Sequence, residues 1–166
     1  MKLLKLFSIA LLGLSLSACG DDNDETIFTI DNVEGHYSGT FVEKVAGADY
    51  ASATLGVNVV KTGPNTLRIE IDDFQASPGN PSMGIPPTMM EETVISNVRL
   101  EEVSNGQFRL VNDPLQAVGT YNGTEFVFNG TFNGTWTLNV LNFAMSFQMG
   151  RMPYPVEATF TGVYQD

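Results

Sequence analysis

The sequence predicts an all-β domain made of antiparallel strands, and three observations carry this prediction. Short runs of alternating apolar and polar residues, rich in Val, Ile, Thr, Phe and Tyr, recur from residue 36 onward. Gly, Asn and Pro separate these runs, and no stretch after Asp31 has a helical period. A sheet with this many hairpins must cover its edges. We therefore expect roughly eight to ten strands, closed into a barrel or folded into a sandwich.

Each strand is predicted from its own alternating run. In the first run, Tyr37, Gly39, Phe41 and Val45 share one face, as period two requires. From Trp136 the apolar phase slips by one residue, so a bulge or turn is expected over 140–142. The expected strands cover residues 36–45, 50–61, 67–71, 93–103, 107–111, 115–121, 124–132, 136–149 and 154–161.

Turn residues divide these runs. Turns are expected at 47–49 and 63–65 and at Asn105-Gly106. Asn122-Gly123 and Asn133-Gly134 lie between alternating residues, which is the strongest short-range signal of a hairpin. Between them, Asn129-Gly130 fits either a third turn or a bulge.

The segment from Gln75 to Met90 breaks the alternation. It holds four of the eight prolines, so we expect no regular ladder in it. Methionine adapts to irregular apolar surfaces, and a loop of this length in a compact domain is usually functional or disordered. The segment is thus either a lid over a barrel mouth or an ordinary loop above core methionines. The methionines beyond the initiator form two clusters: Met83, Met89, Met90, and Met145, Met149, Met152.

The N-terminus has the order of a secretory signal peptide. Lys2 and Lys5 precede an apolar run over 6–16, and small residues lead to the single cysteine, Cys19. The run is much shorter than the roughly twenty residues that span a bilayer. Leu16-Ser17-Ala18-Cys19 resembles a lipoprotein lipobox, which implies cleavage before Cys19 and a thioether link from its sulfur to diacylglycerol. The expected organisation is a signal peptide over 1–18, a lipidated acidic tether over 19–32 and a β-barrel domain over 33–166.

The residues after Cys19 carry four carboxylates in five positions, from Asp21 to Glu25. Such a run repels itself and stays solvated, so we expect it to be extended. It resembles the export signal that sends lipoproteins of Bacteroidetes to the outer face of the outer membrane. The resemblance implies a lipid-anchored outer-membrane protein displayed at the cell surface. The alternative is an acidic linker that carries no export signal, which leaves a periplasmic location open.

Composition excludes several classes of function. Without Lys2 and Lys5, six basic residues face nineteen acidic ones, so a nucleic acid partner is excluded. One cysteine committed to lipid leaves no disulfide and no thiol nucleophile. A single histidine, His36, cannot build a multi-histidine metal site, and no cofactor motif is present. We expect no catalytic residues, no metal and no cofactor.

Adjacent acidic pairs are the remaining catalytic candidates: Asp72-Asp73, Glu91-Glu92 and Glu101-Glu102. Paired carboxylates can hydrolyse glycosides, but neighbours on a strand point to opposite faces. We interpret the pairs as solvated strand faces and strand ends. Pairing across strands stays open, because nothing in the sequence singles out one such pair.

Several segments together resemble the calycin-like, or lipocalin-like, β-barrel lipoproteins of Bacteroidetes. They are the opening 35–41, the strand end 71–74, the strand 94–98, the aromatic hairpins around Trp136 and the closing 155–162. The resemblance covers nearly all of residues 32–164. It implies an up-and-down barrel of about eight strands, often tied to small-molecule binding but with no common ligand.

Two functions follow as hypotheses. The first is a non-catalytic module at the cell envelope that binds a small apolar or amphipathic ligand inside the barrel. Its expected ligand-lining residues are Trp136, Phe143, Met145, Phe147, Met89 and Met90. Small barrels are often filled by their own side chains. A filled barrel would favour the second hypothesis, a structural or protein-interaction lipoprotein that is accessory to a surface complex. The sequence does not identify the protein partner of such a lipoprotein.

Overall fold

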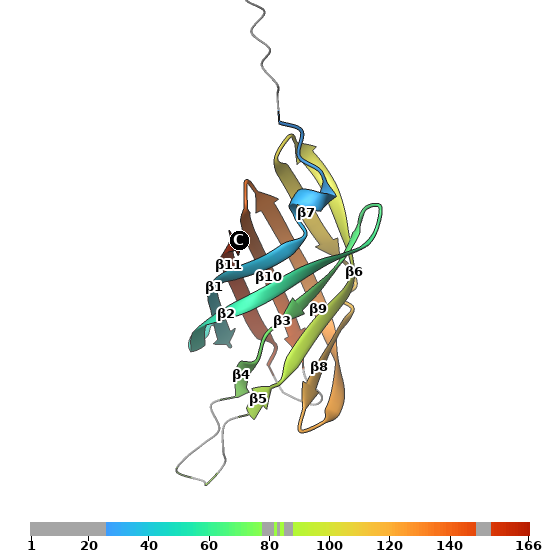
Figure 1. The fold of residues 1–166 in the computed structure, drawn as a ribbon. Coiled ribbons are helices and arrows are strands. Elements are labelled where there is room, and N and C mark those ends of the chain that lie inside the picture. Colours follow the sequence, from blue (N-terminus) through green and yellow to red (C-terminus); the bar gives the residue numbers. More distant parts are fainter. Residues whose placement is uncertain (1–25, 78–81, 83, 85–87, 149–153) are drawn as a thin grey trace, which may run out of the picture.

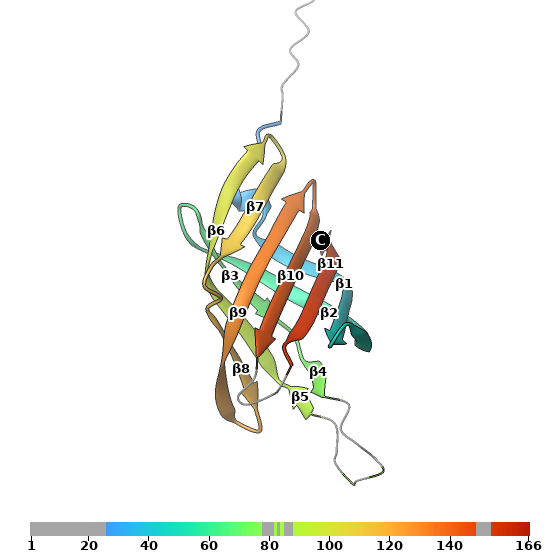
Figure 2. The ribbon, with the colours of Figure 1, turned by 180° about the vertical axis from the view of Figure 1, so that it is seen from behind.

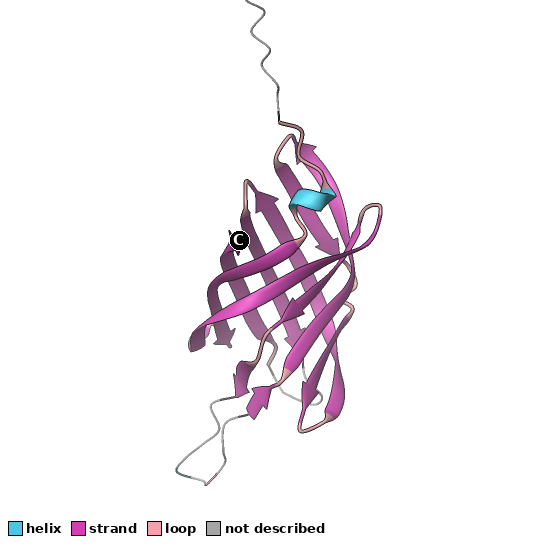
Figure 3. Cartoon of the chain, in the orientation of Figure 1, coloured by secondary structure: helices cyan, strands magenta, loops and turns pink. Residues whose placement is uncertain are grey.

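The computed structural model describes residues 26–77, 82, 84, 88–148 and 154–166. Most of the described residues lie in strands, which confirms the all-β prediction (Figure 3). The elements are η1, a 3₁₀ helix over Ile30–Asn32, and the strands β1 Gly35–Val45, β2 Ala48–Gly63, β3 Thr66–Ile71, β4 Phe74–Ser77, β5 Thr88–Met90, β6 Glu92–Ser104, β7 Gln107–Asn112, β8 Ala117–Tyr121, β9 Thr124–Thr137, β10 Val140–Gln148 and β11 Val156–Gln165.

The main sheet closes into an antiparallel up-and-down barrel, as expected (Figures 1 and 2). Around the barrel the strands pair in the order β1, β2, β3, β6, β7, β9, β10 and β11, and β11 returns to pair with β1, while β4 and β5 form a separate two-stranded sheet. β8 continues the position of β7, since both lie between β6 and β9. The barrel therefore has eight strand positions, and β7 and β8 share one of them.

The barrel interior is filled by the side chains of its inner faces. Phe143 stacks on Phe160 with ring centroids 5.1 Å apart, and Phe132 lies 5.5 Å from Phe143 on the other side. Phe128 and Phe147 stack at 4.7 Å. Burying this apolar surface is the main source of stability in such a domain.

One end of the barrel, which we call the N-terminal end, is covered by residues 26–33. The Phe28 ring lies 5.8 Å from Trp136, and the backbone N–H of Phe28 donates to Asn105 Oδ1 at 3.0 Å. Tyr37 Oη donates to the carbonyl of Val33 at 2.7 Å and accepts from Trp136 Nε1 at 2.9 Å. Residues 26–32, assigned by sequence to the tether, thus contact the barrel.

The opposite end carries the hairpin of β4 and β5, and we call it the β4–β5 end (Figure 1). The expectation of no ladder between Gln75 and Met90 is wrong for the two ends of this segment. Gln75 pairs with Met89 and Ser77 with Thr88. All four prolines lie between these two strands, outside the described residues, so both strands keep the N–H groups that pairing needs.

Of the two Asn-Gly hairpin turns predicted in the second half of the chain, one is confirmed and one is wrong. Asn122-Gly123 is a hairpin turn, with φ of 49° and 69°, as predicted. The turn predicted at Asn133-Gly134 is wrong, because both residues lie inside β9. A Cβ on Gly134 would lie 2.7 Å from the carbonyl oxygen of Asn142, so glycine serves a close approach of backbones there. The turn is formed by Leu138 and Asn139, with φ of 45° and 73°, just before the expected position, since residues 140–142 lie in β10; it produces the slip in apolar phase.

Replacing Tyr37 by Phe should destabilise the N-terminal end. The change leaves the Val33 carbonyl and the Trp136 indole N–H without their buried partner, which predicts a loss of about 2 kcal/mol in the free energy of unfolding. Urea denaturation measures it. The control is Tyr154→Phe at an exposed tyrosine, with an expected change below about 0.5 kcal/mol. Equal losses in both variants would show that the two hydrogen bonds do not stabilise the fold.

Candidate functional site

A buried glutamate lies on the inner face of β1. Alternation points Tyr37, Phe41 and Glu43 into the barrel, and Glu43 is only 1% exposed. Its cross-strand neighbours are small, Ala51 on β2 and Ala158 on β11. Among the described residues, Glu43 Oε1 has no hydrogen-bond partner. Buried polar atoms are nearly always paired, so this carboxyl calls for an explanation.

Glu43 forms part of the wall of a cavity of about 200 Å³ at the β4–β5 end. The Phe41 and Phe74 rings in this wall lie 5.1 Å apart, tilted by 52°. The residues that line the cavity thus include two aromatic ones and two acidic ones, Glu43 and Asp73. Its lining residues are Phe41, Glu43, Ala51, Ser52, Ala53, Asp73, Phe74, Gln75 and Met89.

Burial controls the charge of Glu43. Loss of hydration disfavours the ionised carboxylate and raises the pKa of Glu43 from 4.5 to about 8. At neutral pH the side chain is therefore mostly a neutral carboxylic acid, which can donate one hydrogen bond and accept others. A cation placed against it would favour the ionised form instead. The cavity thus holds a group whose charge depends on what lies beside it.

An acidic depression of about 590 Å³ adjoins the cavity and shares Asp73 with it. It combines two of the acidic pairs, Asp72-Asp73 after β3 and Glu91-Glu92 at the start of β6. Asp72 is held in place because its Oδ2 accepts from the backbone N–H of Gly56 at 3.1 Å. The two pairs thus line one hollow, and pairing of their carboxylates across strands stays a prediction. Within the described residues, no group of three or more acidic, His or Cys side chains could hold a metal.

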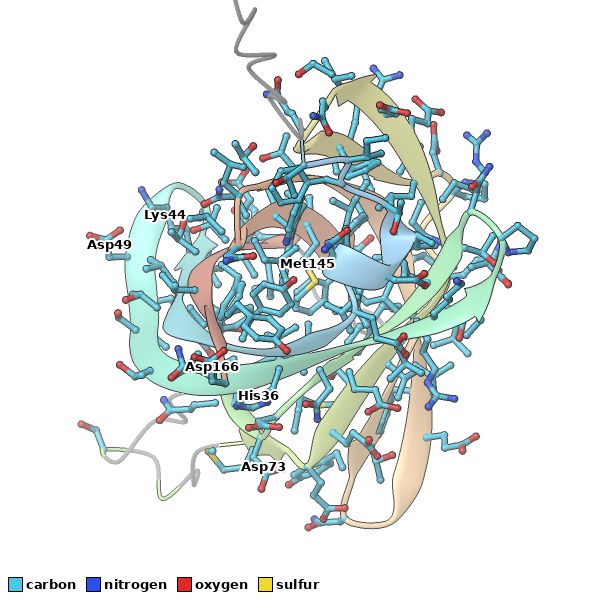
Figure 4. All side chains as sticks on the ribbon, turned by 45° about the horizontal axis from the view of Figure 1, so that its top comes forward. His36, Lys44, Asp49, Asp73, Met145 and Asp166 are labelled. Atoms are coloured by element: carbon cyan, nitrogen blue, oxygen red, sulfur yellow. The ribbon has the colours of Figure 1, made fainter. Side chains whose placement is uncertain are left out.

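The other polar candidates lie outside the barrel. His36 is exposed, and its Nδ1 lies 2.8 Å from the side-chain oxygen of Asn58. Glu101 is ion-paired with Arg109, which holds the pKa of that carboxyl below its ordinary value. Lys44 and Asp49 pair at 3.5 Å on the outside, whereas Met145 lies within the ring of strands (Figure 4).

The structure places the six residues expected to contact a ligand in different parts of the core. Phe143, Met145 and Phe147 share the inner face of β10, but Trp136 lies at the N-terminal end against Phe28 and Phe108. All four are at most 3% exposed and contribute to the filled interior. Their role as ligand contacts stays a prediction.

The two loop methionines differ from each other. Met90 is 1% exposed and belongs to the core, whereas Met89 is 45% exposed and lines the cavity. Met89 is therefore the one predicted contact that the structure places beside Glu43. The centre of the proposed lid, with Met83, and the methionines Met149 and Met152 lie outside the described residues.

Sequence reasoning missed Glu43 and the cavity. The signal was present, because a period of two puts residue 43 on the same face as Tyr37 and Phe41. A charged residue on an apolar face of a strand marks either an edge or a buried ionisable group. The cavity itself depends on the approach of β4 and β5 to β1 and β2, which no local pattern encodes.

Comparisons with known proteins agree with this fold. The sequence model of the calycin-like beta-barrel domain family matches residues 33–163. The chain is also similar to a solved structure named a "putative outer membrane protein" of Bacteroides fragilis NCTC 9343, with a TM-score of 0.63 and 18% identity. The match covers 80% of this chain and 51% of that one, so this chain spans about half the length of its structural neighbour.

At this identity the likeness shows the fold alone. No curated protein matches the sequence. Within the described part of the chain, no helix has the length and hydropathy that a membrane crossing requires.

Replacing Glu43 by Gln should change how stability depends on pH. Between pH 4.5 and about 8 the unfolded chain releases the Glu43 proton and the folded chain keeps it, so rising pH destabilises the wild type. The glutamine side chain of E43Q has no proton to lose. From pH 4 to pH 7 the free energy of unfolding of E43Q should gain about 3 kcal/mol over that of the wild type.

Urea denaturation at several pH values measures this difference. The control is Glu157→Gln, at an exposed glutamate one position from Ala158, the neighbour of Glu43. E157Q should follow the wild type closely. Parallel curves for E43Q and the wild type would show that Glu43 is ionised in the folded protein.

Proposed function

The chain belongs to the calycin-like β-barrel domain family, and we propose that it is a cell-envelope lipoprotein that binds a small amphipathic ligand without catalysis. The binding site is the cavity at the β4–β5 end. One observation carries this proposal: among the described residues, a buried carboxyl oxygen without a hydrogen-bond partner, Glu43 Oε1, belongs to a residue that lines a cavity together with two aromatic residues. Binding sites commonly combine apolar walls with a few polar groups that fix the orientation of a ligand.

The ligand binds at the end of the barrel because the interior is already filled. The Phe128–Phe147 stack and the Phe132, Phe143 and Phe160 contacts occupy the space that an internal ligand would need. A cavity of about 200 Å³ is smaller than most complete ligand sites. It receives one end of the ligand, and the remainder lies over the rim near Ala53 and Met89.

The first described residues and the cavity lie at opposite ends of the barrel (Figure 1). Thr26 is held at the N-terminal end, where its carbonyl accepts from Asn105 Nδ2 at 2.8 Å. Cys19 precedes Thr26 by seven residues, which reach at most about 25 Å. A lipid on Cys19 would keep the N-terminal end near the membrane and direct the β4–β5 end away from it. The outer-membrane name of the structural neighbour supports an envelope location.

Ligand binding is tested with benzyl alcohol, a neutral amphipathic probe, and the full chain in lipid nanodiscs. Methyl NMR should show shifts at Ala53 and Met89, which line the cavity, and none at Ala144 outside it. Ala53→Trp should fill the cavity and weaken binding at least tenfold, about 1.4 kcal/mol. The control is Val127→Trp, at an exposed position of β9, which should bind as the wild type does.

The filled interior also supports a second function, a protein-interaction lipoprotein accessory to a surface complex. The same experiment separates the two. If benzyl alcohol shifts none of the cavity methyl signals, a small-molecule site at the β4–β5 end is contradicted. The accessory function is then the better account.

The anchor and the surface location can be tested in the native bacterium. Cys19→Ser should move the protein from the membrane fraction to the soluble fraction, because the acyl chains contribute nearly all of its membrane affinity. With Cys19 intact, external protease should digest the wild type on whole cells. A variant with Asp21, Asp22, Asp24 and Glu25 changed to the corresponding amides should stay bound to the membrane but should resist digestion by external protease. Equal digestion of both would show that the acidic run is not an export signal.

A further inference from the structure

We infer that the ligand is an organic cation, whose ammonium group is held by the ionised carboxylate of Glu43 and whose apolar part lies against Phe41 and Phe74. This inference rests on the proposed function and names the chemical class of its ligand. Three features of the β4–β5 end support it: the missing partner of Glu43, the sign of the surrounding charge and the aromatic walls.

Among the described residues, Glu43 Oε1 lacks the hydrogen-bond partner that a buried carboxyl oxygen normally has. Its neighbours across the strands are Ala51 and Ala158, which offer no side-chain hydrogen bond. Removal from water without a compensating group disfavours the ionised form. An ammonium group supplies what is absent from the described surroundings, a positive charge with up to three N–H donors. It would make an ion pair inside a site that excludes much of the competing water.

The charges around the cavity favour a cation and disfavour an anion. Asp73 is the second carboxyl of the wall, and Asp72, Glu91 and Glu92 surround the adjoining depression. Among the described residues, no Lys or Arg lines either hollow. Lys44, next to Glu43 in sequence, points outward and pairs with Asp49 at 3.5 Å. The chain as a whole carries a net charge of −11, which attracts cations over longer distances.

The aromatic walls suit an ammonium group attached to an apolar body. The faces of aromatic rings attract cations, and the effect grows where water is excluded. Phe41 and Phe74 are at most 2% exposed and present their rings beside Glu43 in the same wall. Ala51 and Ala53, the β2 neighbours of Glu43 and Phe41, are small and leave room beside them. A compact apolar amine therefore matches both the shape and the charge of the cavity.

Binding of such a cation is coupled to the release of a proton. At neutral pH the free protein holds Glu43 mainly as the acid, and the ligand arrives as an ammonium ion. Formation of the ion pair sends the carboxyl proton to solvent, so charge and atoms balance. Of the described side chains that line the cavity, Asp73 is the other titratable one, while the β2 and β11 neighbours of Glu43 are alanines.

The experiment compares three probes of the same shape, benzylammonium, benzyl alcohol and benzoate, on the full chain in nanodiscs of zwitterionic lipid at fixed ionic strength. The Ala53 and Met89 methyl signals report binding in the cavity. For the wild type, benzylammonium should bind at least tenfold more tightly than benzyl alcohol, and benzoate should be the weakest. For E43Q, the preference for the amine should fall below twofold, with benzyl alcohol nearly unchanged.

Glu157→Gln removes an acidic residue from the outer surface at the same level of the barrel and is the matched control. It should keep the preference of the wild type. Calorimetry at pH 7 in two buffers of different ionisation enthalpy should show release of nearly one proton per benzylammonium bound to the wild type and none with E43Q.

Each contrary result has a distinct meaning. If benzyl alcohol binds as tightly as benzylammonium, the cation inference is overturned and the proposed binding function stands. If E157Q loses the preference as E43Q does, general surface charge attracts the amine, and the role of Glu43 is overturned. If no probe shifts the cavity signals, both the inference and the proposed small-molecule function fail.

Discussion

Closure of the sheet through β1 is the constraint on which the remaining structure depends. β1 pairs with β2 on one side and with β11 on the other, in register over nearly its whole length. This pairing removes the exposed edges that an open sheet would present. It also fixes the inward direction of every second residue, so Tyr37, Phe41 and Glu43 have no alternative to the interior. The two ends of the barrel then differ through what β1 carries at each of them.

At the N-terminal end the inward polar group is satisfied. The hydroxyl of Tyr37 lies between the Val33 carbonyl and the Trp136 indole, so three buried polar groups share one network. Six residues further along the same face, Glu43 meets alanines instead of polar partners. The same strand thus anchors a fully packed end and forms part of a cavity at the other. A change in side-chain size and polarity along one inner face produces this difference.

The sequence predicts the strands well because period-two alternation records which face each residue buries. The inner faces of β1, β3 and β10 follow from Tyr37, Ile69 and Phe143 and their alternating neighbours. Prediction fails where one residue type serves two purposes. Gly134 has the sequence of a hairpin turn, yet it is glycine because a neighbouring backbone approaches it, and that approach exists only in the closed barrel. The cavity is equally non-local, since it forms where β4 and β5 meet β1 and β2.

Two buried polar atoms lack hydrogen-bond partners among the described residues, and they differ in both their chemistry and their surroundings. Thr93 Oγ1 lies beside Gly119 in the packed interior, and a neutral hydroxyl on a β-branched residue is a modest departure from the rules of a good core. Glu43 is a stronger departure, because a leucine would pack there without a desolvation penalty. Sequences violate such rules chiefly where function requires it. The violation at Glu43 coincides with a cavity, aromatic residues and a concentration of negative charge, and this combination is the basis of the proposal that the β4–β5 end is the functional site.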